Sequence, residues 1–181
     1  MIKPKSLKPN STIGIISPSY WLEEKILSTT KSYFNSAGYK TITGQSCKLR
    51  WGPFAGTPQE RAKDIHEMFA NQEIDAIICA RGGYGANRVL PLINYNLIKN
   101  NPKIFIGFSD ITAYLHSITQ NTSLITFHGP MLVSHKNGFV DFNLSSMEKV
   151  VSGNSPTVVK NLKHLKVELV KIISYQVCLK L

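Results

Sequence analysis

Cysteine is scarce in this chain of 181 residues, which contains only Cys47, Cys79 and Cys178. Their number is odd, their spacing is wide and no CxxC pair occurs, so the sequence predicts neither a disulfide framework nor a zinc site. Cys79 stands inside an apolar run and is expected to be a small residue of the core. We expect no metal and no cofactor.

Long apolar runs are also absent. No segment approaches the roughly 18 apolar residues that a membrane-spanning helix needs. The N-terminal segment 1–9 is basic and contains Pro4 and Pro9, so it lacks the apolar centre of a signal peptide. These absences predict a cytoplasmic protein that has no membrane partner.

Acidic residues are few, with 11 Asp and Glu against 21 Lys and Arg, and the formal net charge is +10. Such a surplus favours an anionic partner, of which nucleic acid is the obvious candidate. The lysines are scattered, however, and are not interleaved with aromatic residues. The segment 160–180 alone holds five lysines against one glutamate. We therefore expect no nucleic-acid partner, and a basic nucleotide or nucleic-acid binder remains only a third hypothesis.

What the chain does have is an alternation of strand and helix signals. Short apolar runs predict five strands, at 12–16, 39–43, 75–80, 103–108 and 124–127. Helices are predicted at 22–37, 57–71 and 110–119, with a short one ending near Leu90. Thr57, Pro58 and Glu60 make a strong helix start with a capping box. This pattern predicts an α/β fold with a doubly wound, mainly parallel sheet flanked by helices, followed by an irregular C-terminal tail.

Ligands of such sheets bind beyond the carboxyl ends of the strands. Four polar or glycine-rich features fall at those ends: the loop from Ser17, the loop from Arg81, Ser109 and His128. Their gathering at one edge indicates a site there.

The segment 103–115 is the most informative. An apolar run breaks at Gly107, presents Ser109 and continues as an amphipathic helix from Asp110. A serine on such a turn exposes its hydroxyl beside the free N–H groups of the new helix, which can stabilise an oxyanion. The alternative is a serine that only caps the helix. The segment is not the G-x-S-x-G of α/β-hydrolases, because Ile111 replaces the second glycine.

Residues 81–85 read Arg-Gly-Gly-Tyr-Gly and follow a predicted strand. Glycines at this place let backbone N–H groups approach a ligand, so the segment could supply a second oxyanion donor or bind a phosphate. A plain tight turn is the alternative. The segment is neither G-x-G-x-x-G nor a P-loop, which argues against a nucleotide site.

No histidine gives Ser109 an obvious base. His116 lies two helical turns further on, about 10 Å along the axis, which is too far for a hydrogen bond. His128 ends a neighbouring strand and can line the site. The other histidines without a convincing carboxylate partner are His66, His135 and His164. Spacing alone assembles no Ser-His-acid triad.

Five segments, in order, resemble the LD-carboxypeptidase family of serine peptidases, which includes muramoyl-tetrapeptide carboxypeptidases and microcin C self-immunity peptidases. The matching segments are 14–19 (GIISPS), 56–62 (GTPQERA), 80–91 (ARGGYGANRVLP), 107–113 (GFSDITA) and 127–131 (FHGPM). Together they cover roughly residues 10–135 and make the resemblance specific.

The resemblance implies a role for each matching residue. Ser109 would be the nucleophile that attacks an amide bond between an L- and a D-amino acid of a murein-derived peptide. The N–H groups of Asp110 and Gly83 would hold the oxyanion. Gly82 would begin the turn that carries Gly83. Residues implied in substrate binding are Arg81, Ser17, Ser19 and His128.

In the family, a glutamate and a histidine from a C-terminal domain complete the triad. Here we expect residues 1–150 to form the N-terminal nucleophile domain, and residues 151–181 to be a linker and a truncated or aberrant start of the second domain. His164 and Glu168 are not expected to replace the missing pair, because they lack a scaffold. The expected chain is therefore an inactive or nearly inactive hydrolase.

Two alternatives stay open. One is a non-catalytic remnant that binds peptides, and the other is a microcin-type peptidase that cleaves peptidyl-nucleotides. The face that a second domain would cover is expected to be bare and apolar here, which favours self-association and makes a homodimer one expectation.

Overall fold

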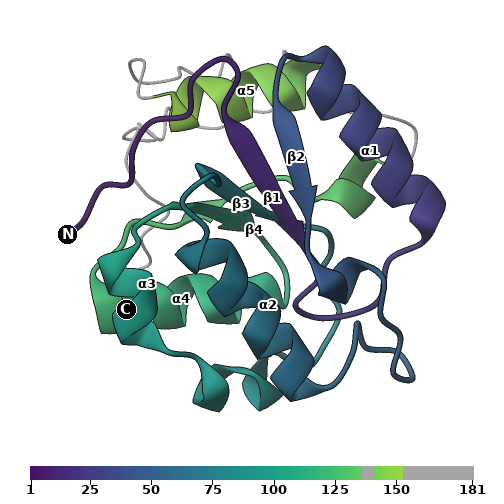
Figure 1. Cartoon of the computed structure of the whole chain (residues 1–181), viewed down its shortest axis with the longest axis vertical. Coiled ribbons are helices and arrows are strands. Elements are labelled where there is room, and N and C mark those ends of the chain that lie inside the picture. Colours follow the sequence, from purple (N-terminus) through teal and green to yellow (C-terminus); the bar gives the residue numbers. More distant parts are fainter. Residues whose placement is uncertain (136–140, 153–181) are drawn as a thin grey trace, which may run out of the picture.

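The computed structural model describes residues 1–135 and 141–152, and its centre is one sheet of five strands (Figure 1). All strand pairs are parallel, in the order β2-β1-β3-β4-β5. The strands are β1 (Thr12–Ile16), β2 (Lys40–Thr43), β3 (Ala76–Cys79), β4 (Ile104–Gly107) and β5 (Phe127–His128). The predicted α/β fold with a doubly wound parallel sheet is confirmed.

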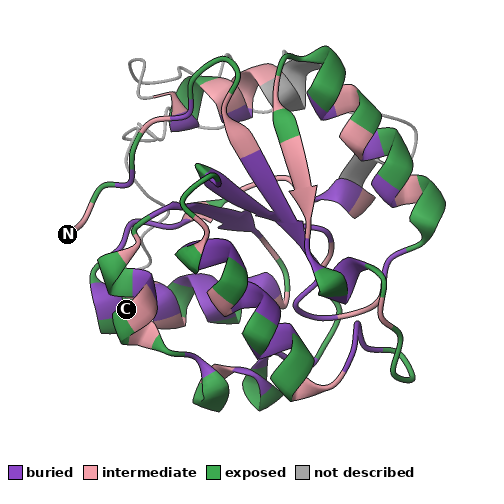
Figure 2. Ribbon diagram, in the orientation of Figure 1, coloured by how far each residue is buried: buried purple, intermediate pink, exposed green. Residues whose placement is uncertain are grey.

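Helices cover both faces of this sheet (Figure 1). They are α1 (Glu24–Ser36), α2 (Pro58–Ala70), α3 (Tyr95–Asn100), α4 (Ile111–Thr122) and α5 (Asp141–Val151). Helices α2, α3 and α4 contribute to one buried apolar cluster, and α1 and α5 contribute to another. The central strands β1, β3 and β4 are therefore buried on both sides, which explains their apolar runs without alternation. They are mostly purple in Figure 2, whereas the edge strand β2 is pink and green.

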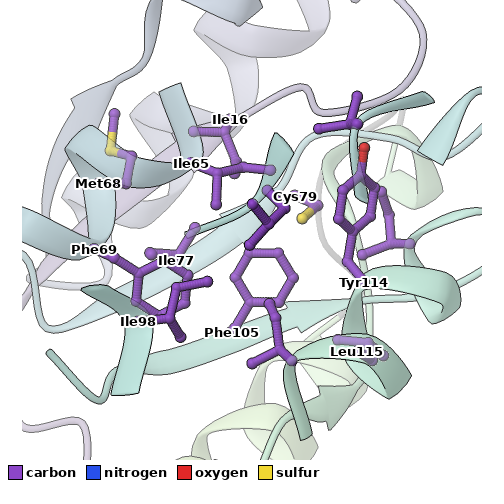
Figure 3. Close-up of a cluster of buried hydrophobic side chains, with 14 of the residues drawn as sticks. Ile16, Ile65, Met68, Phe69, Ile77, Cys79, Ile98, Phe105, Tyr114 and Leu115 are labelled. Atoms are coloured by element: carbon purple, nitrogen blue, oxygen red, sulfur yellow. The ribbon is translucent and has the colours of Figure 1, made fainter. Parts of the chain in front are cut away.

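Successive strand residues point to opposite faces and so join different clusters. Ile77 and Phe105 pack on the side of α2 and α4, whereas Ile78 and Ile106 pack on the side of α1. On the first side the rings of Phe69 and Phe105 stack with centroids 5.7 Å apart (Figure 3). These side chains hold the helices against the sheet and fix the strand ends that carry the site.

Local sequence signals set several helix boundaries as predicted. At the start of α2 the Thr57 hydroxyl accepts from the Glu60 N–H, and the Glu60 carboxylate accepts from the Thr57 N–H at 2.7 Å, which is the predicted capping box. Helix α1 ends just before Gly38, whose φ of +87° is a conformation that glycine adopts without strain.

Three elements differ from the sequence-based predictions. The short helix near Leu90 is two 3₁₀ turns, Ala86–Arg88 and Leu90–Leu92, because Pro91 cannot donate the hydrogen bond that a continuous helix needs. Helix α3 was not predicted; the Asn94 side chain begins it by accepting from the Leu97 N–H at 3.0 Å. Strand β5 starts three residues later than predicted, since Leu124 bridges to Ile2 and not to β4.

The predicted tail 151–181 falls almost wholly outside the described residues, as do His164 and Glu168. Within the described ranges, none of the helices has the length and apolar character required to cross a membrane.

Candidate functional site

The loops that follow β1, β3 and β4 meet at the carboxyl edge of the sheet. The order of the strands reverses between β1 and β3, the place where open α/β sheets bind ligands. The Tyr20 N–H donates to the Gly82 carbonyl at 3.4 Å, which joins the first loop to the second. The sequence signals at Ser17, Arg81 and Ser109 are thus brought to one place.

Ser109 occupies a strained turn between β4 and α4. Its φ is +61°, in the left-handed region that residues other than glycine seldom adopt, and its side chain is exposed. Gly107 lets the helix return close to the strand, because a Cβ there would lie 2.6 Å from Ile111 Cγ2. Strain of about 1–3 kcal/mol at such a residue is typical of functional sites. Asp110, not Ser109, is the residue that precedes α4.

Two glycines of the β3 loop approach the site closely. A Cβ on Gly82 would lie 3.0 Å from Ser109 Cβ and 3.3 Å from the Asp110 nitrogen. Gly83 has a φ of +130°, and a Cβ there would lie 2.4 Å from the Tyr20 ring. The backbone at Gly82 therefore lies directly against the Ser109 turn, and any side chain would disturb it.

The Asp110 carboxylate ties the three loops together. Its Oδ2 accepts from the Ser19 hydroxyl at 2.5 Å and from the Ala86 N–H at 3.1 Å. Sequence reasoning assigned only the backbone N–H of Asp110 to the site and missed this use of its side chain.

Ser17 and Ser19 are fully buried and make hydrogen bonds within the protein. The Ser17 hydroxyl donates to the Tyr20 carbonyl at 2.5 Å, and its N–H donates to Ser46 Oγ at 2.9 Å. Ser46 Oγ in turn donates to the buried Asp64 carboxylate on α2. These bonds fix the loop after β1.

Arg81 is half-buried beside the same loop. Its Nη1 donates to the Trp21 carbonyl at 3.3 Å, and its guanidinium lies 5.5 Å from the centre of the Tyr20 ring. Its buried Nε has no hydrogen-bond partner among the described residues. Arg81 therefore keeps one donor and its charge close to the site.

Arg61 of α2 is a further charged residue, which sequence reasoning missed. Its side chain is fully buried, and Nη1 donates to the carbonyls of Pro18 at 3.0 Å and Gly85 at 3.3 Å. Its Nε and Nη2 have no partner within the described part of the chain. Burial lowers the pKa of this guanidinium, against the effects of nearby Tyr114 and Asp110. The residue connects the β1 loop to the β3 loop.

The histidines lie in different surroundings. His128 is exposed, pairs in register with Gly107, and has its ring 5.8 Å from Phe108, so it lies on the strand next to the Ser109 turn. His116 is exposed on α4, and His66 accepts a hydrogen bond from the Asn94 N–H at 2.9 Å. Among the described residues, the Ser109 hydroxyl has no hydrogen bond to a histidine, and no cluster of His, Cys, Asp and Glu could hold a metal ion.

The sequence also matches a family profile across this site. Residues 13–129 match the LD-carboxypeptidase N-terminal domain, Peptidase_S66. This chain belongs to the LD-carboxypeptidase family. The matched range contains β1 from its second residue onward, the strands β2 to β5, the Ser109 turn and the Arg81 loop.

Named relatives of this LD-carboxypeptidase family member agree in sequence and in fold. It is 43% identical over 130 residues to the probable murein peptide carboxypeptidase of Bacillus subtilis (strain 168), covering 72% of this chain and 41% of that protein. Its fold matches the microcin C7 self-immunity protein MccF in complex with glutamyl sulfamoyl guanosine, with a TM-score of 0.79 and 31% identity over 82% of this chain and 46% of that one.

A muramoyltetrapeptide carboxypeptidase from Oxalobacter formigenes gives a TM-score of 0.72 and 25% identity, over 81% of this chain and 49% of that one. The chain therefore spans less than half the length of the relatives that it matches.

Proposed function

We propose that Ser109 is the nucleophile of a serine carboxypeptidase that hydrolyses an amide bond between an L- and a D-amino acid in murein-derived peptides. The observation that carries this proposal is the exposed Ser109 at a φ of +61°, directly against Gly82, in a member of the LD-carboxypeptidase family. A serine held in this way presents its hydroxyl above the sheet edge, where a substrate carbonyl can approach it.

The developing oxyanion would accept hydrogen bonds from the backbone. Within the described residues, the N–H groups of Asp110 and Gly83 donate to no acceptor, and Gly82 brings their two loops together. Preorganised donors of this kind stabilise the tetrahedral intermediate without reorganisation. Gly82 itself leaves room for the substrate carbonyl.

The substrate would lie between Arg81 and His128. The cationic Arg81 is suited to a carboxylate of the peptide, and the exposed His128 lies on the strand beside the nucleophile. Ser17 and Ser19 contribute by holding the loop after β1, because their hydroxyls already bind Tyr20 and Asp110.

The reaction needs a base that the described residues do not place beside Ser109. Ser109 Oγ attacks the carbonyl carbon while a base takes its proton, the D-amino acid leaves as the amine, and water then hydrolyses the acyl-enzyme. In this proposal the glutamate and histidine of the triad come from a C-terminal domain, and His164 and Glu168 do not replace them, so the 181-residue chain alone is inactive or nearly so.

A chimera tests the nucleophile. Residues 1–150 would be joined to the C-terminal half of the Bacillus subtilis relative, and release of the terminal D-amino acid from a murein tetrapeptide would be followed by chromatography. We expect turnover by the chimera, none after Ser109→Ala, and none by the 181-residue chain. Full activity of the Ser109→Ala chimera would refute the assignment of Ser109, and robust turnover by the chain alone would refute its inactivity.

A second candidate substrate is a peptidyl-nucleotide, which the fold similarity to MccF favours. The same chimera would be assayed with glutamyl sulfamoyl adenosine beside the tetrapeptide. Faster hydrolysis of the nucleoside compound would favour this candidate. Saturable binding of the tetrapeptide to the 181-residue chain without product would instead match a peptide-binding domain.

A further inference from the structure

A hollow lies at the end of β2 beside α1, and β1 and β3 separate β2 from β4, the strand that leads to Ser109. It has a volume of about 760 Å³ and is lined by α1, the end of β2, the 3₁₀ turn Gln45–Cys47 and residues 48–50. We call it the α1 pocket. Neither Ser109 nor the glycines of the β3 loop line it, so it is distinct from the proposed catalytic site. Volumes of about 300–1,000 Å³ are usual for sites that hold small molecules.

The charged side chains that line the α1 pocket are mostly cationic. Lys31 comes from α1, Lys48 and Arg50 follow the 3₁₀ turn, and Glu24 is the one carboxylate of the lining. Among the described residues, none of the three cations forms a salt bridge. Burial raises the pKa of the Cys47 thiol at the pocket wall, while Lys48 and Lys31 both oppose this effect, so two elements direct positive charge to the same point.

The other residues that line the pocket contribute both apolar surface and polar groups. Leu22, Leu27 and Leu49 contribute apolar surface. The Arg50 guanidinium lies over the Trp21 ring at 4.1 Å from its centre, which holds a planar donor group at the pocket. Thr43 also lines the pocket, and its buried Oγ1 has no hydrogen-bond partner within the described chain.

We propose that the α1 pocket binds a small organic anion, with a phosphate or carboxylate held by Lys31, Lys48 and Arg50 and an apolar or aromatic body against Trp21 and the leucines. Charge favours an anion, because three cations and one carboxylate line the pocket and, among the described residues, none of the three cations forms a salt bridge. The volume of about 760 Å³ and the apolar part of the lining favour a molecule larger than a bare inorganic anion.

The test follows Trp21 fluorescence in the 181-residue chain carrying Trp51→Phe, because Trp21 is then its only tryptophan. Phenyl phosphate, benzoate and inorganic phosphate would be titrated in turn. We expect saturable binding of phenyl phosphate or benzoate, with the tighter of the two identifying the acidic group. Inorganic phosphate is expected to bind more weakly; equal or tighter binding would contradict a role for the apolar body.

Charge variants decide whether the pocket itself is the site. Lys31→Gln combined with Lys48→Gln should weaken binding by at least about tenfold. Lys25→Gln is the matched control, since Lys25 is exposed on α1 and outside the pocket lining. It should leave binding unchanged, as should Ser109→Ala. Equal losses in the Lys25 control, or a signal that never saturates, would overturn the proposal.

Discussion

The Asp110 carboxylate holds the loops of the site through one oxygen atom, Oδ2, which accepts from Ser19 and Ala86. Asp110→Ala leaves a buried hydroxyl and an N–H without an acceptor, and should lower the free energy of unfolding by about 1–3 kcal/mol. Asp110→Asn retains an acceptor oxygen and should cost less. Urea unfolding of the 181-residue chain measures both. Equal losses would show that the negative charge near Arg61 matters and that the hydrogen bonds do not.

Arg61 combines a buried charge with two nitrogens that lack a hydrogen-bond partner among the described residues. The two carbonyls that accept from it also accept hydrogen bonds from other donors. The Pro18 carbonyl also accepts from the Tyr114 hydroxyl, and the Gly85 carbonyl also accepts from the Arg88 N–H. Replacing a buried charged group by an apolar side chain of similar size is often neutral or stabilising. We therefore expect Arg61→Met to keep or raise the free energy of unfolding.

Arg61→Ala is the comparison for this prediction. It opens a cavity beside Phe54 and should cost about 2–5 kcal/mol, on the scale of large-to-small core substitutions. Thermal and urea unfolding of both variants would be compared with the unchanged chain. A loss in Arg61→Met as large as that in Arg61→Ala would show that the guanidinium itself stabilises the fold.

Residues of the site differ in how far the sequence reveals them. The turn at Ser109 is encoded locally, because Gly107 and the apolar residues on either side are adjacent in sequence. The roles of the Asp110 and Arg61 side chains depend on Ser19 and Pro18, which lie 91 and 43 positions away in sequence. No spacing along one chain predicts such pairs without the fold.

The secondary-structure elements also differ in this way: some follow from neighbouring residues, and others depend on contacts that are distant in sequence. The start of α2 was predictable, because the capping box of Thr57 and Glu60 lies within four consecutive residues. Helix α3 has six residues, too few to show a helical period in the sequence, and its hydrogen bond to α2 joins Asn94 to His66, 28 positions apart. The start of β5 depends on Ile2, which bridges to Leu124 from the N-terminus.

The contact between α2 and α3 gives a pH-dependent stability. Burial lowers the pKa of His66 from 6.5, and its Nε2 accepts from the Asn94 N–H. Below pH 6.5 the unfolded chain therefore binds more protons than the folded chain, so this contribution to stability is present above pH 6.5 and is lost as the pH falls. Urea midpoints at about pH 7.5 and about pH 5.5 should differ less in His66→Gln than in the unchanged chain.

His116→Gln is the matched control for that experiment, because His116 is exposed on α4. The His116→Gln variant should show the same difference between its urea midpoints at the two pH values as the unchanged chain. If the two variants reduce the difference equally, the effect comes from general charge and not from the His66 contact.

At the scale of the whole molecule, apolar strands separated by helices were enough to predict a parallel sheet, and a parallel sheet was enough to predict the edge at which the loops of Ser17, Arg81 and Ser109 meet. The α1 pocket was not predicted, because its lining comes from α1, β2 and a loop that no periodic pattern connects. Aromatic side chains near the same edge are also exposed: Trp51 is 48% and Tyr84 is 51% accessible.

These two aromatic residues predict self-association of the chain. Trp51 packs against Phe54, and a Cβ at Gly85, next to Tyr84, would lie 2.7 Å from the same ring, so the two exposed aromatic residues belong to segments that meet at Phe54. Exposed apolar surface favours association in water. Sedimentation velocity should show mass increasing with concentration for the 181-residue chain, and less so for the Trp51→Gln, Tyr84→Gln double variant. Leu92→Gln, on a separate 3₁₀ turn and 40% exposed, should not reduce association. A monomer at every concentration, or an equal effect of Leu92→Gln, would contradict this surface as the contact.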